Sequence, residues 1–136
     1  MRIHYRICLT VLALCLAAPA LAATSTPYSM GGRTKDFAVD VDQYRRSGEL
    51  FRITGHCQSA CTMFLSLRNV CIEPSARLLF HAAKTPDGTR RMLNSYNSRL
   101  RGYLNERGIM QSPEFHTISG RTMISRFGYR ACPGGN

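Results

Sequence analysis

A serine lies between two apolar runs near the middle of this chain. The segment reads Gly55-His56-Cys57-Gln58-Ser59 and continues with Ala60-Cys61-Thr62-Met63-Phe64-Leu65. Residues 50–54 are typical of a short strand, and residues 59–67 carry apolar side chains at helical spacing. A strand, a sharp turn and a helix in this order present a serine hydroxyl at the edge of a sheet. The segment therefore predicts an α/β chain with Ser59 at the turn.

A histidine ends a second apolar run, 22 positions after this serine. Residues 70–72 and 77–80 are typical of two further short strands, and His81 directly follows the second of them. A histidine on a neighbouring strand could take the serine proton, which makes Ser59 a candidate nucleophile and His81 its candidate base. Two simpler interpretations stay open: Ser59 as the N-cap of a helix, and His81 as the mere end of a buried strand.

The first 22 residues have the pattern of an export signal. Arg2 and Arg6 precede an apolar stretch over 7–18, and Ala20-Leu21-Ala22 is a small-x-small cleavage site. The apolar stretch is short for a membrane span. We expect cleavage before Ala23, one domain over 23–136, no membrane span after cleavage, and a periplasmic or secreted protein.

The charge balance is strongly basic. Lysine and arginine number 18 against 8 acidic residues, and removing 1–22 takes away Arg2 and Arg6, so the formal net charge falls from +10 to +8. Such an excess is either a solvated surface or an attraction to anionic lipid, nucleic acid or an acidic partner. No nucleic-acid motif accompanies the charge, so a nucleic-acid partner is not expected.

Four cysteines remain after the predicted cleavage. They are Cys57, Cys61, Cys71 and Cys132. Export and an even count predict two disulfides, for which three pairings exist. A bridge between Cys57 and Cys71 would tie two neighbouring strands and leave the other two cysteines to pair or stay free. A metal site that uses Cys57, Cys61 and nearby histidines is the alternative. No paired CxxC is present, so neither a metal nor a cofactor is predicted.

The remaining elements predict a helical second half. Residues 35–46 fit a helix, although alternate apolar residues also fit a strand. The strongest helical periodicity covers 89–107, a further helix is expected from Ser112-Pro113, and a last one over 120–127. The fold class is therefore a small α/β domain with a short parallel sheet, flanking helices and a helical C-terminal half.

The order of these pieces resembles the Clp-protease-like branch of the crotonase superfamily, and most closely its exported, cysteine-containing periplasmic relatives. The resemblance covers roughly residues 29–108. It depends on four segments: Ser29-Met30-Gly31-Gly32 for the family's Ser-Pro-Gly-Gly turn, Gly55 to Ser59 for its Gly-x-x-x-Ser elbow, Val70 to Pro74 for a strand that ends in proline, and Arg77 to His81 for a strand that ends in histidine.

The resemblance implies a serine peptidase or other hydrolase that needs no cofactor and can form a homo-oligomer. It implies helix over 35–46, Ser59 as nucleophile and His81 as base. The oxyanion hole would be the backbone N–H of Ala60 with that of Gly31 or Gly32.

The chain departs from the family in two places. Few residues precede the Gly-Gly turn, where the family has strands. The family's catalytic acid lies in the C-terminal region, and this chain has no acid over 115–136, which leaves Glu114 as the candidate. Because a Ser-His pair without an acid loses much of its rate, the alternative function is a catalytically inactive binding or scaffold protein that contacts a peptide or an envelope protein.

Overall fold

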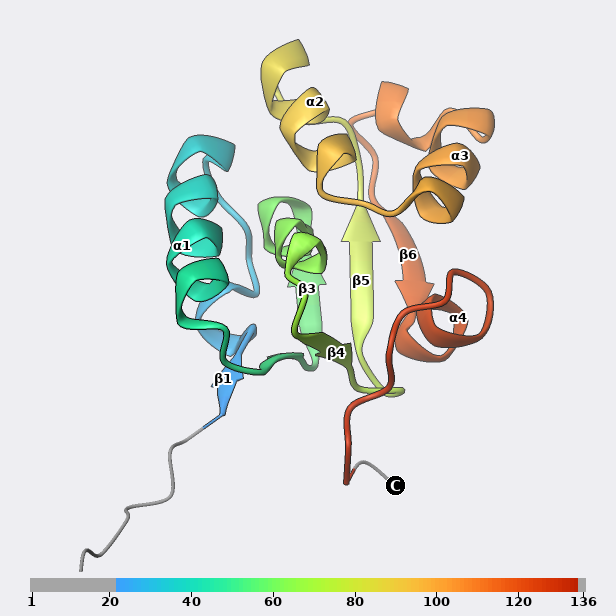
Figure 1. Ribbon diagram of the computed structural model, residues 1–136. Helices are drawn as coiled ribbons and strands as arrows, with labels where there is room; N and C mark the ends of the chain where they lie inside the picture. The colour runs from blue at the N-terminus through green and yellow to red at the C-terminus, as the bar shows by residue number, and fades with distance from the viewer. Residues whose placement is uncertain (1–21, 135–136) are drawn as a thin grey trace, which may run out of the picture.

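The computed structural model describes residues 22–134, so the leader predicted over 1–22 lies outside the described residues except for Ala22. Among the described residues, no helix has the length and apolar character needed to cross a membrane. The elements, in chain order, are β1 (Ala23–Thr24), η1 (Thr26–Tyr28), α1 (Thr34–Ser47), β2 (Phe51–Ile53), β3 (His56–Gln58), η2 (Ser59–Ser66), β4 (Val70–Ile72), β5 (Arg77–Phe80), α2 (Pro86–Asn94), α3 (Ser98–Glu106), η3 (Ile109–Gln111), β6 (His116–Ser119) and α4 (Gly120–Ser125) (Figure 1).

The strands form two three-stranded sheets. The first has the order β1-β2-β4 and is parallel throughout, and the second has the order β3-β5-β6, with β6 antiparallel to β5. Two residues separate β2 from β3, and four separate β4 from β5. The parallel pair of β2 and β4 in the first sheet therefore leads directly into the parallel pair of β3 and β5 in the second. Within the second pair, Gln58 lies opposite Leu79. The residues that follow these two strands therefore emerge at one edge of the sheet.

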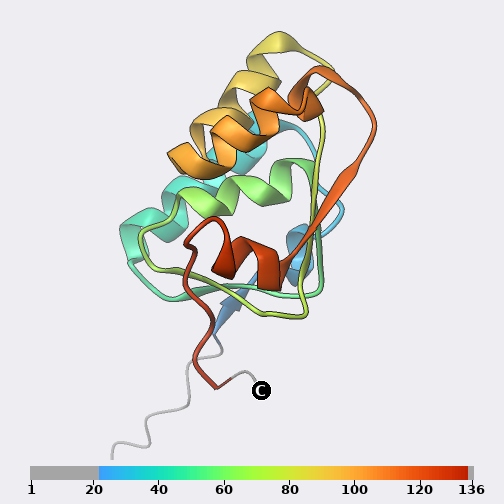
Figure 2. The same ribbon diagram turned by 90° about the vertical axis from the view of Figure 1, so that its right-hand side faces the viewer.

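The helices α1, η2, α2 and α3 lie on one side of the second sheet (Figure 2). Helix η2 is the innermost, and its residues from Ala60 to Leu65 are all buried. Its Phe64 ring stacks on Phe51 of β2 at a centroid distance of 4.2 Å. Burying one such side chain stabilises the fold by about 1.5–3 kcal/mol. Packing in the core therefore fixes the position of η2 and of Ser59, its first residue.

Several sequence predictions are confirmed. Residues 35–46 are helical, with Phe37 and Val41 buried while Val39 is 66% exposed. Alternating strand burial would have placed these three side chains on one face, so the strand interpretation is wrong. The strands expected near 50–54, over 70–72 and over 77–80 are present, as is the last helix, α4.

The single helix expected over 89–107 is two helices. Helix α2 ends at Asn94, and the side chain of Asn97 accepts a hydrogen bond from the Leu100 N–H at 3.0 Å, which caps α3. A second bond, from the Asn97 amide to the Phe127 carbonyl, anchors the break at 2.8 Å. A good N-cap residue begins a helix even where the apolar spacing runs through it.

The helix expected from Ser112-Pro113 is also wrong. Residues 116–119 form β6, in which Ile118 is buried and its neighbours are exposed. The two-residue alternation in His116-Thr117-Ile118-Ser119 is the signal for this strand. A strand therefore interrupts the C-terminal half, which is not wholly helical.

The structure contains the predicted number of disulfides but not the preferred pairing. The bridges join Cys57 to Cys61 and Cys71 to Cys132. Cys57 lies in β3 of the second sheet and Cys71 in β4 of the first, so the two strands are not neighbours. Ala131 pairs with Ile72 instead, which brings Cys132 beside β4. The Cys57–Cys71 bridge was therefore a wrong prediction.

Removing the disulfide that joins distant residues, Cys71–Cys132, should cost more stability than removing the local disulfide Cys57–Cys61. The sequence separations are 61 and 4 residues, for which loop-closure entropy gives about 4 and about 2 kcal/mol. We expect Cys71→Ala/Cys132→Ala to lower the urea midpoint of unfolding more than Cys57→Ala/Cys61→Ala does. Equal midpoints for the two double variants would contradict this account.

Candidate active site

Ser59 occupies a strained turn between β3 and η2. Its φ of +55° makes it the one residue other than glycine with a positive φ in the described part of the chain. The left-handed conformation costs an L-residue roughly 1–2 kcal/mol. Strain of this kind gathers at functional sites, where surrounding structure holds it. The turn therefore has the backbone geometry expected of a nucleophile elbow.

The hydroxyl of Ser59 faces a histidine rather than the helix end. Ser59 Oγ lies 2.7 Å from His81 Nε2, and the N-cap of η2 is Gln58, so Ser59 is the first residue of the helix and not its cap. The two residues follow β3 and β5, which are adjacent and parallel. The expected contact between Ser59 and His81 is present, and the N-cap interpretation of Ser59 does not fit the structure.

The surroundings of His81 favour its neutral form. Burial lowers the pKa of His81 below the ordinary 6.5, and a hydrogen bond with the backbone of Pro113 acts in the opposite direction. Proline has no N–H, so its carbonyl accepts and the imidazole donates. Since Nε2 faces Ser59, we assign the donated proton to Nδ1. Nε2 then carries the lone pair that could accept the serine proton.

No carboxylate contacts His81 within residues 22–134. Glu114, the acid considered from the sequence, is exposed, and its backbone N–H bonds to Ser112 Oγ at 3.2 Å while its carboxylate makes no hydrogen bond or ion pair with a described residue. The hydrogen-bonding neighbour that acts on the pKa of His81 is instead the backbone of Pro113. No sequence motif points to Pro113, because every residue carries a carbonyl.

The turn before α1 lies directly against Ser59. A Cβ on Gly31 would come within 2.8 Å of the Gln58 carbonyl, 3.0 Å of Ser59 Cβ and 3.3 Å of Ala60 N. Only a residue without a side chain allows the two backbone segments to approach this closely. The first N–H groups of a helix lack partners inside it, and the Ala60 N–H has no backbone acceptor among the described residues.

The two glycines of this turn differ in their hydrogen bonds. The Gly31 N–H donates to the Tyr28 carbonyl at 3.0 Å and is already engaged. The Gly32 N–H has no backbone acceptor among residues 22–134. Of the two N–H groups considered from the sequence as oxyanion donors, only that of Gly32 is without a backbone acceptor among the described residues.

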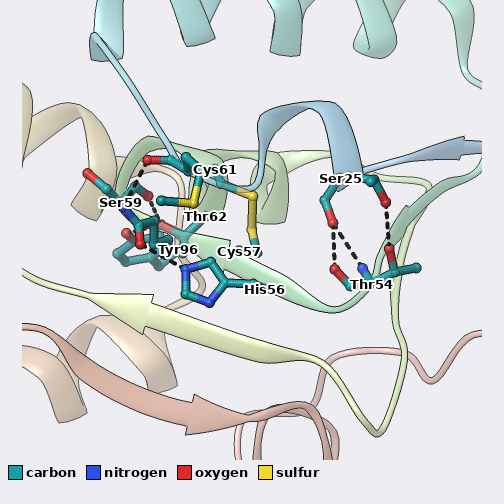
Figure 3. Close-up of a disulfide and its surroundings, with 11 residues drawn as sticks. Ser25, Thr54, His56, Cys57, Ser59, Cys61, Thr62 and Tyr96 are labelled. Carbon is teal, nitrogen blue, oxygen red and sulfur yellow. Dashed lines mark hydrogen bonds between the residues drawn. A yellow bond between two sulfur atoms is a disulfide. The ribbon is translucent and has the colours of Figure 1, made fainter.

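Buried contacts stabilise the turn at Ser59. The disulfide between Cys57 and Cys61 spans Ser59, and both cysteines are buried (Figure 3). Thr62 Oγ1 donates to the Ser59 carbonyl at 2.7 Å, and the Tyr96 hydroxyl lies 2.6 Å from Thr62 Oγ1. A hydroxyl has one proton, so Tyr96 donates to Thr62. Burial raises the pKa of Tyr96, which keeps this donor protonated.

A cleft of about 780 Å³ opens over Ser59 and His81. The N-terminal turns of α1 and α2 form two of its walls, and Met30 and Phe115 reach it from the loops on either side. The Phe115 ring lies 4.3 Å from the His81 ring. A volume of this size accommodates a ligand larger than a small ester.

Comparison with known protein families, curated proteins and solved structures gives no match for this chain. The metal-binding interpretation of Cys57 and Cys61 requires free thiolates, and the disulfide uses both sulfurs. The chemistry that the Ser59–His81 contact allows is proton transfer from the serine hydroxyl to the imidazole.

Gly31→Ala should disturb the elbow, and Gly48→Ala provides a matched control. Both glycines have a positive φ, +71° and +67°, but a Cβ at position 48 would meet nothing within 4 Å. We expect Gly31→Ala to slow the labelling of Ser59 by a neutral fluorophosphonate about tenfold or more, which corresponds to about 1.4 kcal/mol. Gly48→Ala should lose some stability and label at the original rate. Equal labelling of the two variants would show that Gly31 leaves no required space.

Proposed function

We propose that this chain is an exported, periplasmic serine hydrolase of the Clp-protease-like kind, which cleaves an acyl bond in a peptide or ester. The observation that carries the proposal is the 2.7 Å contact between Ser59 Oγ and His81 Nε2 at a serine with φ +55°. The order of turn, elbow and histidine-ending strand supports the Clp-like assignment. The two disulfides support a location in an oxidising compartment.

In this mechanism, His81 Nε2 takes the proton of Ser59 as Oγ forms a bond to the substrate's carbonyl carbon. The carbonyl oxygen becomes an oxyanion, which the N–H groups of Ala60 and Gly32 would stabilise. The imidazolium then gives its proton to the leaving amine or alcohol as that bond breaks. Water repeats the sequence on the acyl-serine and releases the acid.

The Pro113 carbonyl can perform part of the work of the missing acid. The backbone of Pro113 is a hydrogen-bonding neighbour of His81, and in this mechanism its carbonyl accepts from Nδ1, which selects the tautomer in which Nε2 is free. The carbonyl carries no full charge, so it stabilises the imidazolium less than a carboxylate would. We therefore expect slow turnover with the correct tautomer in place.

Labelling with a fluorophosphonate tests the nucleophile. Ser59→Ala and His81→Ala should each remove nearly all labelling and ester hydrolysis, and the double variant should be no worse, because the pair acts as a unit. The exposed residues Ser98 and His116 supply matched controls, and Ser98→Ala and His116→Ala should label normally.

Circular dichroism of each variant separates loss of labelling from loss of folding. If the folded Ser59→Ala variant retains the original hydrolysis, the serine is not a nucleophile and the chain is better described as a binding module.

The labelling rate should rise with pH, with a midpoint below 6.5. The base is neutral His81, and burial lowers its pKa, so the reactive form predominates at neutral pH. As the pH is lowered below 6.5, the unfolded chain binds more protons at this residue than the folded one does, so the free energy of unfolding should decrease as the pH decreases and increase again as the pH rises. A labelling midpoint above 7 would contradict the assigned environment of His81.

A further inference from the structure

The cleft contains both lysines of the chain. Of the 18 basic residues only Lys35 and Lys84 are lysines, and both line the cleft over Ser59 and His81. Lys35 lies in the first turn of α1, and Lys84 lies three residues after His81. Neither forms an ion pair with another residue in the described part of the chain. Two flexible ammonium groups from different segments therefore line the cleft that contains the reactive pair.

The acidic residues of the cleft are already matched by arginines. Asp36 pairs with Arg33 at 2.8 Å. Asp87 pairs with Arg91 at 2.9 Å and also with Arg90, and the hydrogen bond from Arg91 is the largest cause of its lowered pKa. Lys35 adds a weaker attraction to the same carboxylate. The summed charge of these side chains stays positive, so an anion in the cleft gains attraction.

The opening of the cleft is apolar. Three large hydrophobic side chains are strongly exposed among residues 22–134, and two of them, Met30 at 69% and Phe115 at 49%, line this cleft. Exposed apolar surface gathered at a cavity marks a place where a ligand is bound. The third, Val39, is 66% exposed on α1 and lies outside the cleft.

We propose that the substrate of this site is an anionic acyl compound: an apolar acyl chain that lies between Met30 and Phe115 and ends in a carboxylate that Lys35 and Lys84 bind. This inference rests on the proposed hydrolase activity, because it concerns the specificity of the same site.

Two activated esters with acyl chains of equal length test the proposal. The first is mono-p-nitrophenyl adipate, which ends in a carboxylate, and the second is p-nitrophenyl hexanoate, which ends in a methyl group. After subtraction of the Ser59→Ala rate, kcat/KM should favour the adipate ester about fivefold or more, as two partly exposed ion pairs allow. The preference should shrink at high salt, because the Debye length falls to about 3 Å at 1 M.

Variants locate the source of the preference. Lys35→Gln/Lys84→Gln should abolish it, and Lys35→Arg/Lys84→Arg should retain most of it, because the charge is kept. Arg46→Gln, which removes one exposed charge from the far end of α1, should leave it intact.

The apolar part of the proposal has its own pair of variants. Met30→Ala should lower kcat/KM for both esters about fivefold, as expected when contact with a few methylene groups is lost. Val39→Ala, which removes an exposed apolar side chain outside the cleft, should change neither value.

A neutral fluorophosphonate separates the two ways of failing. If Ser59 is labelled but the hexanoate ester is hydrolysed as fast as the adipate ester, the hydrolase proposal stands and the anionic specificity is overturned. A preference that survives in the glutamine double variant also overturns it. If Ser59 is not labelled and neither ester is hydrolysed above the Ser59→Ala rate, the hydrolase proposal fails and the specificity fails with it.

Discussion

The parallel pairing of β3 with β5 determines whether this chain has a site at all. Gln58 lies opposite Leu79, and the residues that follow the two strands carry the serine hydroxyl and the imidazole, 2.7 Å apart. A shift of one residue in this pairing would turn the side chains of one strand to the other face. Cys57 and Leu78 are fully buried side chains from the two strands, so a slip would expose apolar surface. Burial thus fixes the register, and the register fixes the distance.

A second constraint holds the serine in an unfavourable conformation. The left-handed backbone of Ser59 costs roughly 1–2 kcal/mol. One disulfide joins Cys57 and Cys61, which lie on the two sides of Ser59 in the sequence. Thr62 accepts a hydrogen bond from Tyr96 and donates one to the Ser59 carbonyl. The buried residues of η2 anchor the helix that begins at Ser59. None of these contacts uses the Ser59 hydroxyl, which contacts His81 instead. The free-energy cost of the strained backbone is therefore offset by groups that take no part in the proposed proton transfer.

The sequence was informative where one residue type meets a local requirement. The elbow and the strand over 77–80 follow from spacing. Spacing left residues 35–46 open between helix and strand, and the family resemblance favoured the helix that the structure contains. The break between α2 and α3 was not, because Asn97 begins a new helix inside an unbroken apolar pattern. The disulfide pairing depended on which strands are neighbours, and β4 is covered by the C-terminal segment around Ala131. Pro113 could not be found from sequence, because its backbone carbonyl and not its side chain contacts His81.

The nature of that contact explains what kind of base this site can hold. A buried carboxylate beside the ring would raise the pKa of the histidine and stabilise its charged form, whereas burial next to a neutral carbonyl lowers it. The imidazole is then largely neutral and ready to accept a proton, but it is a weaker base and its protonated form is less stable. In the proposed mechanism, much of the stabilisation of the transition state would therefore come from the backbone N–H groups of Ala60 and Gly32, which have no backbone acceptor among the described residues. A site of this design depends more on backbone geometry at the elbow than on side-chain charge at the base.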